Sequence, residues 1–329
     1  MRENTVSKKE VTSVPNVRLS RVQRVLQSFR SNPGYTLMRA VARFLTVRQL
    51  VAISRRALTT KKKNEYLAAC ASRMPETQFP EIDRGSFVSE LRRNGVAFGL
   101  KLPAQTVGAI HRYAENAPCY ADRVPSLGFR LNQRSAADAA IGKPILVAQY
   151  FNSASACPDI GRLVDDPMLQ AIACEYLESA PTFVGANLWW TFPVDALDAD
   201  REQHAHLFHR DVDDFRFFKF FFYLTDVVAG DGGHVCVIGS HHRPPQVRFG
   251  DRWNIRRYTD TEISDQFPAN DIQEICGPAG TGFAENTLCV HKGRTPTTHP
   301  RLLLQLQFAL FDYGAMHDRR DSAQLRQMV

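Results

Sequence analysis

The spacing of apolar residues along this chain changes character near residue 182. Upstream, apolar residues recur three and four positions apart, which is typical of helices with one buried face. The second of these helices begins with an apolar stripe over 37–45, and we expect it to end at the run Lys61-Lys62-Lys63. A short strand over 93–102 is expected to open the main domain. The helices predicted in this way cover residues 17–29, 37–45, 103–115 and 166–178.

Downstream, aromatic and β-branched residues dominate short segments that are divided by clusters of Gly, Pro and Asp. This pattern predicts β-strands. Several strands with no helical periodicity between them favour a sandwich or a barrel. The predicted strands cover residues 182–192, 215–228, 233–238, 280–290 and 302–311.

Alternate residues of a strand point to opposite sides, so the residue pattern of a strand shows what each face presents. Two of the predicted strands have one apolar face and one face that includes polar residues. In 217–225 the even positions are all apolar, whereas the odd positions include Lys219 and Tyr223. In 301–310 the even positions are again all apolar, and Arg301 stands on the odd face. Because unpaired buried charge is costly, these polar faces predict a buried ligand, which a jelly roll with an anion in its interior would supply.

The composition is that of an ordinary globular protein, with 44% hydrophobic and 23% charged residues among 329. No run approaches the ~20 consecutive apolar residues that a membrane span needs. Seven cysteines without a C-x-x-C pair, and no opening secretory signal, favour a reducing, cytoplasmic setting. The formal charge of +7 is unevenly spread, because residues 1–63 hold fifteen Arg or Lys against two acids.

The basic N-terminal segment leaves three interpretations open. It packs on the main domain as a helical subdomain, which we favour, or its residues 17–63 lie on an anionic membrane surface, or it is an organellar targeting segment. A nucleic-acid role is disfavoured, because the stretch matches no recognised binding module and the rest of the chain is acidic. We therefore predict a basic helical segment 1–80, a main domain 81–315 and a tail 316–329.

Among ten histidines, His209 alone begins a His-x-Asp or His-x-Glu triplet, which ends at Asp211. A facial iron site uses two imidazoles and one carboxylate on one side of an octahedron and leaves three positions open. The second imidazole must return from a distant strand. His291 follows a predicted strand, and Arg301 opens the next one ten residues later. A Gly-rich turn at 230–233 leads to the sequence Ile-Gly-Ser-His at 238–241 between the two halves of the motif.

These residues resemble the phytanoyl-CoA dioxygenase family of Fe(II)/2-oxoglutarate oxygenases over roughly residues 93–312. The resemblance implies a mainly β fold with flanking helices and a double-stranded β-helix core of the jelly-roll, cupin-like type. It implies His209, Asp211 and His291 as iron ligands. It also implies Arg301 as the clamp on the distal carboxylate of 2-oxoglutarate, a role that suits a planar guanidinium.

The activity that the resemblance implies is that of an Fe(II)- and 2-oxoglutarate-dependent dioxygenase using O2. It would hydroxylate an unactivated C–H bond of a small organic substrate and release succinate and CO2. Related halogenases lack the carboxylate ligand, so the presence of Asp211 favours hydroxylation. The alternative is a non-catalytic jelly-roll protein that binds a metal or a sugar.

Lys219 and Tyr223 are expected to contact 2-oxoglutarate or to form a hydrogen bond inside the jelly roll. Thr295 or Thr297 is expected to help Arg301 hold the carboxylate of 2-oxoglutarate. The alternative for Lys219 is an edge strand that points its lysine into solvent. His242, with Arg252 ten residues on, is a rival to His291, but Arg252 falls in a polar loop. The remaining histidines near the motif are expected to be hydrogen-bonded or exposed: His204, His206, His234, His241 and His299.

The connection 243–275 is long, which predicts a lid or substrate loop, with a plain solvated loop as the alternative. In the first case its cations and aromatic residues would grip the substrate. We expect that substrate to be a small molecule that is anionic, sugar-bearing or linked to an acyl carrier. The residues concerned are Arg252, Trp253, Arg256, Arg257 and Tyr258.

Overall fold

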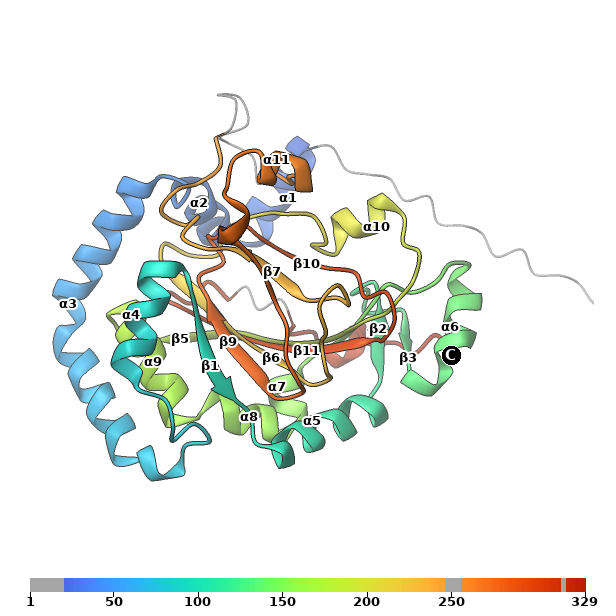
Figure 1. Cartoon of the computed structure of the whole chain (residues 1–329), viewed down its shortest axis with the longest axis horizontal. Coiled ribbons are helices and arrows are strands. Elements are labelled where there is room, and N and C mark those ends of the chain that lie inside the picture. The colour runs from blue at the N-terminus through green and yellow to red at the C-terminus, as the bar shows by residue number, and fades with distance from the viewer. Residues whose placement is uncertain (1–20, 247–255, 315–317) are drawn as a thin grey trace, which may run out of the picture.

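Two antiparallel sheets form the centre of the molecule in the computed structural model, which describes residues 21–246, 256–314 and 318–329 (Figure 1). The larger sheet has the strand order β1-β9-β6-β11-β5-β4-β2-β3, and the smaller has the order β10-β7-β8. The strands are β1 Val96–Lys101, β2 Cys119–Ala121, β3 Gly128–Phe129, β4 Val147–Tyr150, β5 Thr182–Thr191, β6 Phe217–Tyr223, β7 His234–Val237, β8 Ile272–Ile275, β9 Thr281–Glu285, β10 His291–Gly293 and β11 Arg301–Ala309.

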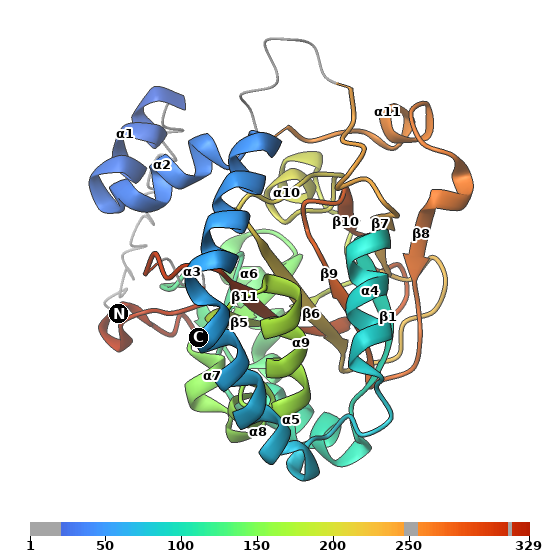
Figure 2. The same cartoon turned by 90° about the vertical axis from the view of Figure 1, so that its left-hand side faces the viewer.

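Helices cover the outer face of the larger sheet, and α3 runs along α9 beside it (Figure 2). Asp166 caps the buried helix α9 by accepting hydrogen bonds from the Met168 and Leu169 amides. The helices are α1 Arg21–Ser31, α2 Pro33–Val41, α3 Leu45–Ser72, α4 Arg84–Asn94, α5 Ala104–Asn116, α6 Arg134–Ile141, α7 Ser153–Ala156, α8 Pro158–Val164, α9 Pro167–Leu177, α10 Asp198–Gln203 and α11 Asp260–Ser264.

The alternation of residues on β6 and β11 divides the core into two layers. Even-numbered residues such as Phe220 and Leu304 pack against the helices in the largest hydrophobic cluster. Odd-numbered residues such as Phe221 and Leu303 face the smaller sheet and pack with Cys236. The predicted fold class is therefore confirmed: the protein is mainly β with flanking helices, and its two sheets form a double-stranded β-helix core.

Two expectations about the elements are wrong. The run Lys61-Lys62-Lys63 does not end a helix but lies in the middle of α3. Lysine is a good helix former on an exposed face, so a charge run does not by itself stop a helix. The strand expected over 280–290 ends early, because β9 stops at Glu285 and residues 286–290 turn toward the smaller sheet, where β10 begins at His291.

The N-terminal helices contact the main domain through a narrow stripe. Met38 and Ala42 are buried against Phe217 and Ala309 at one end of the larger sheet. Leu37, expected on the same apolar face, is 60% exposed, because α2 is short and meets the sheet with one side only. No helix within the described residues is long and apolar enough to cross a membrane.

Candidate metal centre and cavity

The segment that carries His209 and Asp211 is held as an extension of the smaller sheet. The His209 amide donates to the His291 carbonyl and the His291 amide to the His209 carbonyl, both at 2.9 Å. The Asp211 amide donates to the Thr287 carbonyl at 2.8 Å. These backbone bonds bring together residues that lie eighty positions apart in the sequence, and the two imidazole rings lie 4.2 Å apart by their centroids.

Both imidazoles are oriented by a hydrogen bond on their far nitrogen. His209 Nδ1 lies 2.9 Å from the Leu207 carbonyl, and His291 Nδ1 lies 2.9 Å from the Cys289 carbonyl. A carbonyl only accepts, so each Nδ1 carries the proton and, in the neutral ring, each Nε2 carries a lone pair. The two Nε2 atoms face the Asp211 carboxylate at 3.7 and 3.6 Å.

Within the part of the chain that the structure describes, His209, Asp211 and His291 form the one group of three potential metal ligands whose ligand atoms all lie within 4.8 Å of one another. Burial, and then the neighbouring His291, lower the pKa of His209 well below its usual value, so its ring is neutral. Two imidazole nitrogens and a carboxylate on one side of a point in space are the donor set of a facial metal site.

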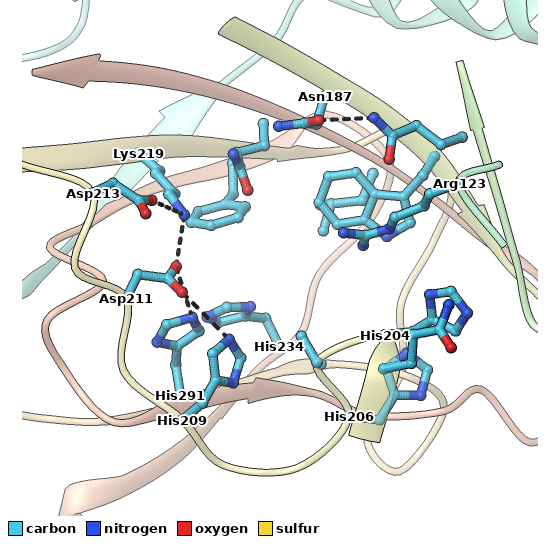
Figure 3. Close-up of a pocket in the computed structure, with 18 of the residues that line it drawn as sticks. Arg123, Asn187, His204, His206, His209, Asp211, Asp213, Lys219, His234 and His291 are labelled. Carbon is cyan, nitrogen blue, oxygen red and sulfur yellow. Dashed lines mark hydrogen bonds and ion pairs between the residues drawn. The ribbon is translucent and has the colours of Figure 1, made fainter. Parts of the chain in front are cut away.

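The Asp211 carboxylate is ionised and held by Lys219. Burial alone would raise the pKa of Asp211, but Lys219 and the two imidazoles lower it well below its usual value. Lys219 Nζ lies 2.6 Å from Asp211 Oδ2 and 3.4 Å from Asp213 Oδ2 (Figure 3). Lys219 is buried, so the structure excludes the interpretation of a lysine pointing from an edge strand into solvent.

The triad opens onto a cavity of about 420 Å³, a volume typical of small-molecule sites. Lys219, Phe221 and Arg301 reach it from the larger sheet, whereas His234 and His291 reach it from the smaller one. The cavity therefore lies between the two sheets, on the face of β6 and β11 that carries their polar residues.

Arg301 is buried at the start of β11 and lines this cavity. Its Nη1 donates to the Gly232 carbonyl, and its Nη2 donates to Thr191 Oγ1 at 3.2 Å. Its Nε is buried and has no hydrogen-bond partner among the described residues. A buried guanidinium with an unused donor is suited to bind an anion that enters the cavity.

The other two residues expected to contact 2-oxoglutarate lie behind the cavity wall. The Tyr223 hydroxyl donates to the Ile275 carbonyl at 2.8 Å and accepts from the His234 amide at 2.9 Å. Thr295 Oγ1 lies 2.8 Å from His206 Nδ1. Neither Tyr223 nor Thr295 lines the cavity. Both support residues that do line it.

Three of the remaining histidines are nearer the site than the sequence suggested, since His204, His206 and His234 line the cavity. The ring of His234 stacks on that of His291 with centroids 5.5 Å apart, and its Nε2 donates to Glu285 Oε2 at 2.6 Å. The exposed His242 does not line the cavity.

The connection 243–275 lies only partly within the described residues. Arg252 and Trp253 fall outside them. Arg257 lines the cavity, whereas Arg256 pairs with Glu262. The Tyr258 amide donates to the Phe208 carbonyl at 2.8 Å, which fixes this end of the connection beside the metal-binding segment.

Several cavity residues were missed from the sequence. Asp213 pairs with Lys219, Arg123 comes from the loop after β2, and Tyr35 and Arg39 come from α2. On β5, Asn187 and Trp189 face the cavity and their neighbours face the helices. The alternation used for β6 and β11 would have found the β5 residues. No local signal marks the others, because they meet only when distant elements pack.

Neither a family model nor a curated protein matches the chain. The epimerase SnoN, solved with Fe3+, alpha ketoglutarate and nogalamycin RO, is similar with 16% identity and a TM-score of 0.48 over 68% of this chain and 82% of that one. HygX from Streptomyces hygroscopicus, solved with nickel, 2-oxoglutarate and hygromycin B, has 15% identity and a TM-score of 0.48 over 68% and 86%. EvdO2 from Micromonospora carbonacea var. aurantiaca has 19% identity and a TM-score of 0.45 over 69% and 90%. Likeness at this level does not identify a reaction.

Proposed function

We propose that this protein is a non-haem Fe(II)- and 2-oxoglutarate-dependent dioxygenase that hydroxylates an unactivated C–H bond of a small organic substrate. The observation that carries the proposal is the convergence of His209, Asp211 and His291 on the wall of one cavity. Two imidazoles and one carboxylate on one side of a metal leave positions for a cosubstrate and O2.

The residues present fit a ferrous ion. In the neutral ring each imidazole offers the lone pair of Nε2 to a metal, because Nδ1 donates its proton to a backbone carbonyl. Asp211 offers an ionised oxygen, since Lys219 binds Oδ2 and leaves Oδ1 facing His209. Imidazole nitrogen and carboxylate oxygen together suit divalent iron.

When bound, Fe(II) and 2-oxoglutarate would supply the oxidising chemistry with O2: 2-oxoglutarate would lose CO2 and take one oxygen atom of O2 to give succinate, and the other oxygen atom would hydroxylate the substrate. The chain's own residues position these groups. Arg301 binds a carboxylate of 2-oxoglutarate in this proposal, which gives its unused Nε donor a partner. Lys219 keeps Asp211 deprotonated and fixes its orientation, and His234 restrains the ring of His291 by stacking on it.

The second candidate function is that of a non-catalytic metal- or sugar-binding jelly roll. One observation favours it: Lys219 Nζ pairs with Asp211 Oδ2 at 2.6 Å, so this carboxylate has a structural partner within the chain. Formation of succinate from 2-oxoglutarate separates the two candidates. The dioxygenase requires that this activity depend on Fe(II) and be abolished in Asp211→Ala.

The proposal is tested by titrating Fe(II) anaerobically into the metal-free protein with 2-oxoglutarate and recording the visible charge-transfer band of the chelate. We expect the band in the wild type and its loss in His209→Ala. His242→Ala is the matched control, because His242 is exposed and outside the cavity, and it should keep the band. Iron binding without a band would favour the non-catalytic candidate. If no iron binds, these residues form neither a catalytic nor a non-catalytic metal site.

Arg301→Lys tests the cosubstrate site separately. It keeps a positive charge but loses the planar fork that pairs with a carboxylate. We expect half-saturation of the band to need about tenfold more 2-oxoglutarate, the equivalent of one charge-assisted hydrogen bond. Unchanged half-saturation would show that 2-oxoglutarate binds elsewhere.

A further inference from the structure

The cavity holds more positive than negative side chains. Its acids are Asp211 and Asp213, and Lys219 pairs with both. The charges of a ferrous ion and of the 2-oxoglutarate dianion cancel, so binding both leaves the excess of positive charge in the cavity unchanged. The arginines that line the cavity are Arg39, Arg123, Arg257, Arg301 and Arg320.

Three of these arginines form no ion pair with an acid of the described residues. Within residues 21–246, 256–314 and 318–329, no carboxylate lies within ion-pair distance of Arg39, Arg123 or Arg257. Arg39 Nε and Arg257 Nη1 are buried and have no hydrogen-bond partner there. Buried donors of a permanent cation are rarely left unpaired in a folded protein unless a ligand completes them.

Arg123 is presented to the cavity by a strained turn. Asp122 and Arg123 both have a left-handed backbone, with φ of 52° and 63°. The turn is held by Asp122, which lies 2.9 Å from Lys143 Nζ and 3.2 Å from His204 Nε2. Consecutive left-handed residues that are not glycine are unfavourable and concentrate at ligand sites.

The Arg123 guanidinium lies over the ring of Trp189, 5.7 Å from its centroid. Figure 3 shows it across the open space from Asp211, on the side of His204 and His206. Arg123 is exposed to the cavity, yet the protein around it and, next, the nearby charge of Arg257 together lower its pKa to about 10. Two cations that face one space are stabilised by a shared anion.

We propose that the primary substrate is an organic anion whose phosphate or carboxylate group is bound by Arg123 and Arg257, across the cavity from the metal. This inference rests on the proposed function, since it assigns Arg301 to 2-oxoglutarate and leaves the other arginines to the substrate. The body of the substrate is polar, because the cavity offers Gln305 and the hydrogen-bonded amides of Gln149 and Asn187, 3.0 Å apart.

The test uses the full chain with saturating Fe(II) and 2-oxoglutarate under anaerobic conditions, so that the cosubstrate site is already filled. Glucose 6-phosphate and glucuronate are the phosphate and carboxylate probes, and glucose is the neutral control. Tryptophan fluorescence reports binding, because an anion that binds the guanidinium of Arg123 changes the surroundings of Trp189. The chelate band is recorded in the same samples.

The variants are Arg123→Ala, Arg257→Ala and the control Arg134→Ala. Arg134 also lies over an aromatic ring, 4.0 Å from the centroid of Phe192, but it does not line the cavity. We expect saturable binding of at least one anion and none of glucose. Each cavity variant should weaken anion binding about tenfold while keeping the chelate band, and Arg134→Ala should change neither.

Each other outcome is decisive. If the band forms and neither anion saturates, or if glucose binds as well as the anions, the substrate inference fails and the proposed function stands. Anion binding that survives both cavity variants also overturns the inference. If the wild type gives no band, the proposed function itself fails. Preference for glucose 6-phosphate or for glucuronate tells a phosphate from a carboxylate.

Discussion

The two faces of β6 and β11 have opposite chemistry on the same backbone. On the helix face, Phe220 and Leu304 lie in an all-apolar cluster. On the cavity face, Lys219 and Arg301 are also buried but charged. Neighbouring positions on one strand thus face an apolar layer on one side of the sheet and a polar interior on the other.

The difference shows how this fold separates stability from chemistry. The helix face contributes apolar burial and tolerates no polar atom without a partner. The cavity face keeps its charges because they have specific partners: Lys219 has Asp211 and Asp213, and Arg301 has the Gly232 carbonyl. Substitutions on the helix face should therefore change folding, and those on the cavity face should change metal and ligand binding.

The largest effect is expected for Asp211→Ala. It removes one metal ligand and the main partner of Lys219. Succinate formation should fall ~100-fold or more, since even changes around metal ligands cost up to this factor. The measurement is Fe(II)-dependent succinate production, with thermal unfolding to show that the variant is folded. Near-normal activity in a folded variant would remove Asp211 from the metal site.

Phe220→Ala tests the opposite face. The side chain is fully buried among aromatic and aliphatic neighbours, so its truncation leaves a hole in the core. We expect a loss of ~3–5 kcal/mol in the free energy of unfolding, measured with a chemical denaturant. The chelate band of the folded variant should keep its wavelength and iron affinity. A shifted band would show that the two faces are coupled.

Lys219→Met joins the two effects. It leaves the buried Asp211 carboxylate without its cation, which should lower the stability of the metal-free protein by ~3 kcal/mol. A divalent metal then replaces the missing charge, so Fe(II) should stabilise this variant more than it stabilises the wild type. The exposed Lys61→Met is the control and should show neither effect. An equal metal-induced shift in all three proteins would contradict the role given to Lys219.

The smallest effect is expected for Tyr35→Phe. The Tyr35 hydroxyl on α2 donates to Asp213 Oδ1 at 3.3 Å, and Asp213 in turn holds Lys219. Its loss should cost about 1 kcal/mol of stability and alter the chelate band slightly. Tyr66→Phe removes a different hydroxyl contact, from α3 to Gln170 of α9 and away from the cavity, and should leave the band unchanged. Identical bands in Tyr35→Phe and Tyr66→Phe would show that α2 does not influence the metal site.

Local sequence patterns predicted the elements whose two faces differ. The alternation over 217–225 and 301–310 located β6 and β11, and the helical spacing over 103–115 and 166–178 located α5 and α9. Short elements such as β2, β3 and β8 were missed, since two to four residues carry no measurable period. The end of β9 at Glu285 was missed because residues 286–290, which turn toward the smaller sheet, are buried and contain neither Gly nor Pro.

By itself, the sequence determined the strands with one apolar and one polar face, because residue spacing records local geometry. It also identified candidate site residues, because residue type records metal and ligand chemistry: His209, Asp211, His291 and Arg301. Only the tertiary structure decided what surrounds them. Arg123 and Tyr35 enter the cavity from segments with no motif, and Tyr223 is turned to the backbone behind the wall. Such neighbours depend on how distant elements pack, and packing is a property of the whole chain.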